Sequence, residues 1–346
     1  MKILYAIQGT GNGHLSRAQD IVPVLQKKGE VDIVVSGTQA DVTLPYPIKY
    51  KLRGFSFIFG KKGGVDVWRT YLKSNAKKLY IDIKKIPVED YDLILNDFEP
   101  VSAWAAYLKK IPCIGLSHQA AVLNRKAPKP KKKDRLGSMV LKKYAPTSKE
   151  YGFHFKSYDQ NIFTPIIRKR IRDLSPGNEG HYTVYLPAYD DKKLLKSLSK
   201  FKKTKWEVFS KHNHKEVKLN NVMIKPVSNE AFLESFRTCE GILCGAGFET
   251  PAEALFLQKK LMVIPMKGQY EQQCNAAALK EMGIPVVKSL KTKHHLKIDN
   301  WLESDQSIAV DYPDETEEII DHVIENSSHH VDESHNIHPE VDYFLK

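Results

Sequence analysis

Short apolar runs alternate with longer amphipathic stretches through the first half of the chain. The amphipathic stretches predict helices near residues 16–28, 68–78 and 102–109, and the apolar runs predict strands at residues 2–6, 32–35, 92–96 and 113–116. Pro23 is expected to bend the first helix. Apolar strands that alternate with helices form a parallel sheet covered on both faces.

The alternation stops between residues 158 and 180, where prolines and a glycine predict a linker, and then resumes. The second series of strands is predicted at residues 182–186, 206–209, 222–224, 241–244 and 261–264. We therefore predict two doubly wound, Rossmann-like α/β domains, residues 1–157 and 181–326, facing each other across a cleft. A final helix at 315–325 could return to the first domain, and the His-rich residues 327–346 are expected to form a loosely ordered tail.

Two of the predicted strands lead into glycine-rich turns. The first strand is followed by the residues IQGTGNGH, which include Gly11 and Gly13. The strand at 241–244 is followed by Gly245 and Gly247, and a helix is predicted to begin at Thr250 or Pro251. A glycine turn that opens a helix suits a phosphate group, and in open α/β sheets ligands bind at this carboxyl edge.

A polar loop follows the last predicted strand and leads into a helix that runs to about Met282. Glu271, Gln272 and Gln273 lie in this loop, where carboxylate and amide groups are able to bind adjacent hydroxyls. The alternative is an ordinary polar helix start.

The residues GAGFETPAE and the later EQQCNA together resemble the donor-binding motif of GT-B glycosyltransferases, in particular the MurG-like and UDP-glycosyltransferase branches with a family 28 type C-terminal domain. The turn IQGTGNGH resembles the N-terminal glycine turn of MurG. The resemblance covers nearly the whole chain in order and length, and it implies the GT-B fold of two Rossmann-like domains.

The resemblance implies roles for the donor-side residues. Glu253 matches the carboxylate that binds the ribose, and Val227 matches the loop whose backbone contacts the base. The other implied donor-binding residues are Gly11, Gly13, Gly245, Gly247, Phe248, Glu249, Thr250, Glu271, Gln272 and Gln273. Glu253 has an alternative role, because TPAE is also a capping box in which Glu253 would bond the amide of Thr250.

Three residues are candidates for catalysis. The resemblance implies that His14 removes the proton from the acceptor hydroxyl, and a carboxylate that holds its tautomer is expected beside it. Asp97 ends its strand at the same sheet edge and is the expected partner, with Glu99 as the alternative and helix capping as a competing role for Asp97. His118 is the second candidate base, and Gln119 and Glu99 are expected on the acceptor side.

Two departures from the family pattern stand out. The glycine-rich turn after the first C-terminal strand is replaced by LPAYD, where Tyr189 or Lys192 would have to compensate. Asp90 and Asp92 form a DxD, but they precede their strand and belong at the opposite edge of the sheet. We therefore expect no metal and no cofactor beyond the UDP-sugar co-substrate.

Composition adds localisation and partners to the prediction. The net charge is +12, and a basic run from Arg125 to Arg135 predicts a surface loop that either attracts an anionic membrane or is simply solvated. The four cysteines lack CxxC spacing and predict buried thiols rather than disulfides or zinc. No apolar run approaches the roughly 18 residues that span a bilayer. We expect a cytoplasmic protein, peripheral at the inner face of a membrane.

The sequence thus predicts an inverting, metal-independent glycosyltransferase that moves a hexosyl or N-acetylhexosaminyl group from a UDP-sugar to a hydroxyl of a lipid or lipid-linked glycan. A nucleotide-sugar epimerase or hydrolase of the same fold is the first alternative, and it would release free sugar without transfer. A basic nucleic-acid-binding protein is the second, although no basic stripe interleaved with aromatic residues supports nucleic acid as a partner.

Overall fold

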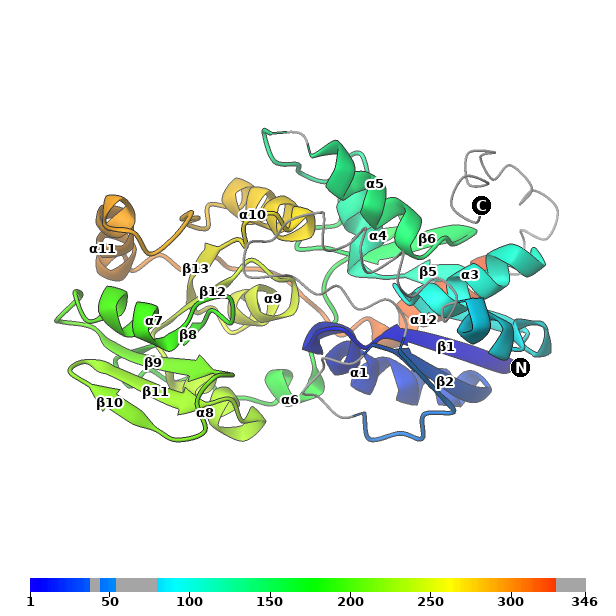
Figure 1. Cartoon of the computed structure of the whole chain (residues 1–346), viewed down its shortest axis with the longest axis horizontal. Coiled ribbons are helices and arrows are strands. Elements are labelled where there is room, and N and C mark those ends of the chain that lie inside the picture. Colours follow the sequence, from blue (N-terminus) through cyan, green and yellow to red (C-terminus); the bar gives the residue numbers. More distant parts are fainter. Residues whose placement is uncertain (38–43, 54–79, 133, 328–346) are drawn as a thin grey trace.

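The computed structural model describes residues 1–37, 44–53, 80–132 and 134–327. Its two parallel sheets stand side by side along the long axis of the molecule (Figure 1), each covered by helices, which confirms the predicted GT-B architecture. The helix predicted at 68–78, the basic residue Lys133 and nearly all of the predicted tail lie outside the described residues.

The first sheet has seven parallel strands in the order β3-β2-β1-β4-β5-β6-β7. Its strands are β1 (Lys2–Gln8), β2 (Glu30–Ser36), β3 (Tyr50–Leu52), β4 (Leu93–Asp97), β5 (Ile114–Leu116), β6 (Lys149–Phe153) and β7 (Ile162–Phe163). The four strands predicted here are confirmed to within about two residues. The central position of β1 and β4 brings the turns that follow them to the middle of the carboxyl edge.

Among the described residues, the helices of this half include α1 (Asn12–Lys28), α3 (Pro100–Lys109), α4 (His118–Leu123) and α5 (Arg135–Tyr144); residues 80–85 are also helical, and a short 3-10 turn lies at Val88–Asp90. Helix α1 begins four residues earlier than predicted and continues through Pro23. Gly11 precedes it with a φ of 92°, a conformation that glycine adopts without strain.

The second sheet has six strands in the order β10-β11-β9-β8-β12-β13, of which only β10 is antiparallel to its neighbour. Its strands are β8 (His181–Tyr185), β9 (Lys205–Ser210), β10 (Val217–Leu219), β11 (Val222–Pro226), β12 (Gly241–Gly245) and β13 (Lys260–Ile264). The accompanying helices are α7 (Asp191–Leu198), α8 (Asn229–Thr238), α9 (Glu249–Phe256), α10 (Tyr270–Glu281) and α11 (His295–Glu303), with a 3-10 turn at Thr292–His294.

Two segments connect the halves. The predicted linker 158–180 contains β7, which extends the first sheet, and the short helix α6 (Lys169–Arg172). The sequence did not predict β7, because two residues are too few to show the hydrophobic periodicity of a strand. Helix α12 (Thr316–Ser327) returns to the first half and packs on α1, where Lys28 pairs with Asp321 at 2.6 Å. The final helix therefore returns to the first half, a possibility that the sequence alone did not decide.

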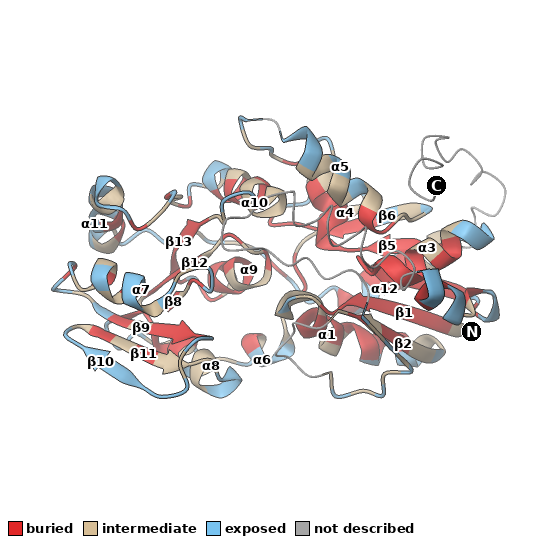
Figure 2. Ribbon diagram, in the orientation of Figure 1, coloured by how far each residue is buried: buried red, intermediate tan, exposed pale blue. Residues whose placement is uncertain are grey.

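The buried apolar residues line both sheets and the helices that face them (Figure 2), and within the described residues they divide into three clusters. One apolar cluster joins side chains of both halves, including Phe153 and Phe155 of the first and Phe248 of the second. All four cysteines are free and buried, as predicted. Among the described residues no helix has the length and apolar character needed to cross a bilayer.

Candidate active site

The carboxyl ends of β1 and β4 bring His14 and Asp97 together. Asp97 is the last residue of β4 and pairs in register with Ile7, while His14 lies in the first turn of α1. His14 Nδ1 lies 2.8 Å from Asp97 Oδ1, and the His14 side chain remains 13% exposed. The predicted contact is therefore present, and Asp97 does not cap the next helix.

Arg17 joins the pair to the other half of the molecule, and sequence reasoning missed it. Its guanidinium Nη2 donates to both oxygens of Asp97 at 2.8 and 2.7 Å, and its Nη1 donates to Glu249 of α9. Although burial by itself would raise it, the pKa of the Asp97 carboxyl is held below its ordinary value by Arg17 and His14. Arg17 follows His14 by three residues on an otherwise apolar face of α1. That spacing was the feature of the sequence from which its place beside His14 could have been predicted.

Glu249, predicted on the donor side, reaches across to the N-terminal turn. A Cβ at Gly13 would lie 3.0 Å from Glu249 Cγ, so glycine at this position permits the approach. Burial raises the pKa of Glu249 to about 7, and the guanidinium of Arg17 opposes this rise. The bridge between Arg17 and Glu249 is thus a full ion pair only above that pH.

His118 lies at this sheet edge but is enclosed. Its Nδ1 is 2.8 Å from the carbonyl of Phe153, its Nε2 is 2.8 Å from Oδ1 of Asn275, and its ring stacks on Phe248 with centroids 3.9 Å apart. Burial lowers the pKa of His118. The prediction that His118 is a candidate base is therefore wrong: both ring nitrogens are engaged, and His118 helps to join the two halves. Asn275 of the second half is the fully buried partner of His118.

Gln119 connects the histidine to the polar loop of the second half. Its Nε2 is 3.4 Å from His14 Nε2 and donates to Glu271 Oε2 at 3.1 Å. Glu271 lies in the first turn of α10, so it belongs to the helix start and not to the loop in which the sequence predicted it. The Nε2 atom of His14 and the carboxylate of Glu271 thus face each other across one amide group.

Glu99 does not face the acceptor side. Its carboxylate is fully buried and caps α3, accepting from the amides of Val101 and Ser102 at 2.7 Å and from the hydroxyl of Ser36 at 2.5 Å. The predictions of Glu99 as an acceptor-side residue and as the alternative partner of His14 are wrong. Because its side chain precedes Pro100, it is well placed to satisfy the open amides of the helix start.

Glu253 is paired with Arg168 of the linker. The guanidinium donates from Nε to Oε1 at 2.5 Å and from Nη2 to Oε2 at 2.8 Å. Helix α9 begins at Glu249 rather than at Pro251, and no side chain caps it. The capping-box interpretation of Thr250 and Glu253 is therefore wrong.

The remaining donor-side residues surround the carboxyl ends of β11, β12 and β13. Among the described residues no atom lies within 4 Å of a Cβ built on Gly247 or Gly11. Gln272 accepts from the Met266 amide at 2.8 Å, and Gln273 donates to the Met266 carbonyl at 2.9 Å, so both hold the loop. The implied positions that flank this space are Val227, after β11, Gly245, which ends β12, and Thr250 in α9.

Neither departure in the sequence adds a ligand group. Asp190 caps α7 by accepting from the Lys193 amide at 2.8 Å. Asp92 accepts from the Lys2 amide at the amino end of β1, as expected from its position before β4. Within the described ranges, no group of three or more His, Cys, Asp or Glu side chains is arranged to hold a metal ion.

Comparisons with known proteins decide the family. The family model described as glycosyl transferase family 1 matches residues 1–304. The chain belongs to this glycosyltransferase family. A comparison with curated proteins finds no match.

The fold of this glycosyltransferase is similar to those of solved structures at low sequence identity. Acinetobacter baumannii MurG is 14% identical with a TM-score of 0.53, over 94% of this chain and 99% of that one. Arabidopsis thaliana UGT89C1 complexed with UDP is 13% identical with a TM-score of 0.60, over 94% of each chain. Phytolacca americana UGT2 complexed with UDP-2fluoro-glucose and pterostilbene is 11% identical with a TM-score of 0.58, over 94% of this chain and 93% of that one.

Proposed function

We propose that this glycosyltransferase is inverting and moves a sugar from a UDP-sugar to an acceptor hydroxyl without a metal ion. The observation that carries the proposal is the arrangement of His14 between Asp97 and Gln119. It gives a base whose Nδ1 is held by a carboxylate and whose Nε2 faces the amide of Gln119, which in turn donates to Glu271 of the second half.

In the proposed reaction, Asp97 accepts a hydrogen bond from Nδ1–H of neutral His14, which fixes the tautomer and leaves Nε2 unprotonated as the base. The acceptor hydroxyl occupies the place next to Nε2 where the amide of Gln119 now lies. Its oxygen bonds to the anomeric carbon as its proton passes to Nε2, and the bond from that carbon to the diphosphate breaks on the opposite face. UDP departs, and one displacement inverts the configuration.

Glu253 is proposed to bind the ribose in the orientation that Arg168 gives it. A carboxylate has about four lone-pair sites, and the two bonds from Arg168 occupy one site on each oxygen. One site on each oxygen is left for a ribose hydroxyl. Glu271 is proposed to bind hydroxyls of the sugar, because it is the carboxylate that faces His14 through Gln119.

Two positive features support diphosphate binding without a metal. The amides at the start of α9 are not capped by a side chain, and the helix dipole places positive potential there. The guanidinium of Arg168 lies beside the same helix through Glu253. UDP is the proposed nucleotide because UGT89C1 was solved with UDP and UGT2 with UDP-2fluoro-glucose, and the sugar is proposed to be a hexose or N-acetylhexosamine.

The acceptor is proposed to be a lipid or lipid-linked glycan presented at an anionic membrane surface. Helix α5 exposes Leu136 and Met139, 38% and 42% exposed, directly after the basic run. Exposed apolar side chains beside lysines suit the interfacial region of a membrane. Within the basic run, Lys129 donates to the carbonyls of Val122 and Asn124 and remains exposed.

The proposal is tested with the full-length protein and a panel of nucleotides. UDP and UDP-sugars are expected to raise the melting temperature, and GDP and ADP to raise it less. Transfer is then measured with the stabilising UDP-sugar and membrane lipid extracts, with and without EDTA. Release of free sugar with no glycosylated lipid would favour a hydrolase, and loss of activity in EDTA would overturn metal independence.

A further inference from the structure

Helix α11 begins with a leucine that faces solvent. Leu296 is 73% exposed, more than any other large apolar side chain that the structure describes. Ile298 and Trp301 of the same helix are buried, and the helical repeat places Leu296 on the opposite side of the helix. Leu296 therefore adds nothing to the core of its own half and offers its apolar surface to a partner.

Exposed lysines surround Leu296. They are Lys288, Lys291, Lys293 and Lys297. Burial lowers the pKa of the neighbouring His294, and the charges of these lysines, all but Lys291, lower it further, so three of them lie close to one imidazole. Among the residues that the structure describes, none of the four pairs with a carboxylate at salt-bridge distance. The positive charge at this place is thus concentrated.

The charge stands at the end of the helix that disfavours it. The first turn of α11 contains no acidic residue, and Lys293 and Lys297 lie just before it and within it. Positive charge is unfavourable at a helix N-terminus, because the helix dipole places positive potential there. The acidic side chains of α11, Asp299 and Glu303, follow in its later turns. The stability of the helix therefore does not explain these lysines, whereas an anion bound from outside does.

A second stretch of the chain extends the charged surface. The ring of His295 packs on Phe201 with centroids 5.0 Å apart. Lys200, Lys202 and Lys203 adjoin Phe201 in sequence, and all three are exposed. We call the α11 surface the set made by Leu296, these three lysines and the four lysines near His294. It combines seven positive charges with one exposed apolar side chain.

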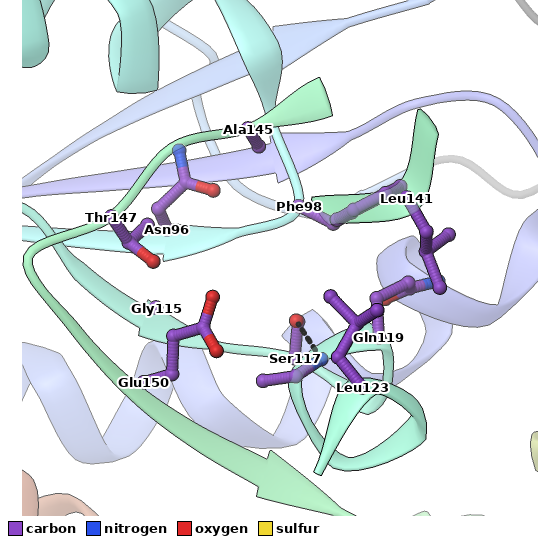
Figure 3. A pocket seen from close by; sticks show the side chains of 11 residues that line it. Asn96, Phe98, Gly115, Ser117, Gln119, Leu123, Leu141, Ala145, Thr147 and Glu150 are labelled. Carbon is purple, nitrogen blue, oxygen red and sulfur yellow. Dashed lines mark hydrogen bonds between the residues drawn. The ribbon is translucent and has the colours of Figure 1, made fainter. Parts of the chain in front are cut away.

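The α11 surface lies on the same side of the molecule as helix α5. Helices α10 and α11 lie above the sheet of the second half in Figure 1, and α4 and α5 lie above the sheet of the first half. Leu141 of α5 lines a pocket with Gln119 of the first half (Figure 3), so that side of α5 is directed inward. Leu136 and Met139 share the other side and are exposed. One flat surface above the molecule is therefore able to meet both halves.

An anionic membrane fits this combination better than a nucleic acid does. At a membrane, a leucine enters the boundary between headgroups and acyl chains while lysines bind the anionic headgroups. A single-stranded nucleic acid uses exposed aromatic side chains, on which its bases stack. In the described part of the chain, Tyr80 is the one aromatic residue among the exposed large apolar side chains, and it belongs to the first half. The α11 surface offers no such platform.

We propose that the α11 surface is a membrane contact of the second half, in which Leu296 enters the acyl boundary and the lysines bind anionic lipid headgroups. The inference rests on the proposed function, which places the acceptor at such a membrane through the first half, and deepens it. Two contacts on separate halves bind more tightly than either alone, because the second forms in a complex that already exists. The donor-binding half is thereby held at the surface on which the acceptor lies.

The test measures binding of the full-length protein to vesicles by sedimentation. The vesicles contain phosphatidylcholine alone, or phosphatidylcholine with an equal amount of phosphatidylglycerol. The wild-type protein is expected to bind the second kind more tightly. Leu296→Gln is expected to weaken that binding about tenfold, because less apolar surface is buried. Lys293→Gln combined with Lys297→Gln is also expected to weaken it about tenfold, and to reduce its dependence on salt.

The matched controls lie on the other side of the second sheet, at β10 (Figure 1). Leu219→Gln changes an exposed leucine there, and Lys215→Gln combined with Lys218→Gln changes two exposed lysines. Insertion is measured with Leu296→Cys carrying the fluorophore NBD, since the four natural cysteines are buried and leave the label to this position. Its emission should move to shorter wavelength on the phosphatidylglycerol vesicles, and an unchanged emission would contradict insertion.

Equal binding of the wild-type protein and both α11 variants would overturn the inference, as would an equal loss in the β10 controls. Tighter binding to polyuridylate RNA than to the vesicles at the same salt would overturn it in favour of a nucleic acid. Vesicle binding that still depends on Leu296 after Lys131 and Lys132 become glutamate would support a separate contact. The shift in melting temperature on adding UDP is measured for every variant. If UDP stabilises none of them, the proposed function fails, whereas the contact is decided by the vesicles alone.

Discussion

Replacing Arg17 tests whether the buried charge network holds the active site together. Arg17→Met keeps the length and apolar stem of the side chain but leaves the Asp97 carboxylate, which has no exposed surface, without the guanidinium that pairs with it; the contact with His14 remains. Breaking one side of a buried ion pair costs about 3–5 kcal/mol. Since about 2–4 °C of melting temperature correspond to 1 kcal/mol in domains of this size, we expect a fall of roughly 6–20 °C.

The assay is thermal unfolding, with urea unfolding as a second measure. The matched control is Arg237→Met, which removes an arginine from a surface pair with Glu234 and is expected to leave the melting temperature nearly unchanged, because solvent screens such a pair. The double variant Arg17→Met, Asp97→Asn removes the stranded charge and should recover part of the loss. Equal melting temperatures for Arg17→Met and Arg237→Met would refute the reasoning.

Four further sets of substitutions test the other proposed roles. His14→Ala should lower turnover by about 10²–10⁴ while UDP binding stays unchanged, and near-normal turnover would remove His14 as the base. Glu253→Ala should weaken UDP binding about tenfold in calorimetry, with Glu234→Ala as an exposed control, and equal affinity would remove the ribose contact. The pKa of Glu249 lies at about 7, above its ordinary value of 4.5, so the stability it contributes at low pH is lost as the pH rises through about 7. Between about pH 5 and about pH 8, the melting temperature of Glu249→Gln should therefore decrease less than that of the wild-type protein. An equal decrease in the two proteins would show that Glu249 is not its cause. Replacing Lys131 and Lys132 by glutamate should weaken binding to vesicles rich in anionic lipid, measured by sedimentation. Binding that persists would exclude a role of the basic run in membrane binding.

The fold was predictable because its signals are local. Each predicted strand of a parallel sheet is a short apolar run, and the glycine turns after β1 and β12 mark the carboxyl edge. Elements without periodicity, such as β7 with two residues, left no such signal. The family motif likewise rests on a local signal, because the residues that predict the donor side are close together in sequence.

Side-chain pairing was less predictable, because it depends on residues far apart in the chain. Arg17 meets Asp97 and Glu249, 80 and 232 positions away, and His118 meets Asn275 after 157. Local spacing favoured capping for Glu253, whereas the fold gives it an arginine from the linker. Glu99 shows the reverse case: a buried carboxylate beside the active site is used entirely by its own helix.

The chain crosses between the two halves twice, and the crossings are bonded to each other. Arg172 of α6 donates to the carbonyl of Pro313, which lies in the segment that leads to α12. Tyr312 in that segment donates to the carbonyl of Phe155 in the first half at 2.9 Å. Two bonded connections resist twisting and sliding more than a single one does, and bending about one axis strains them least. We therefore expect any opening between the two halves to be a hinge rotation about these connections, which would return Glu271 to the same position relative to His14.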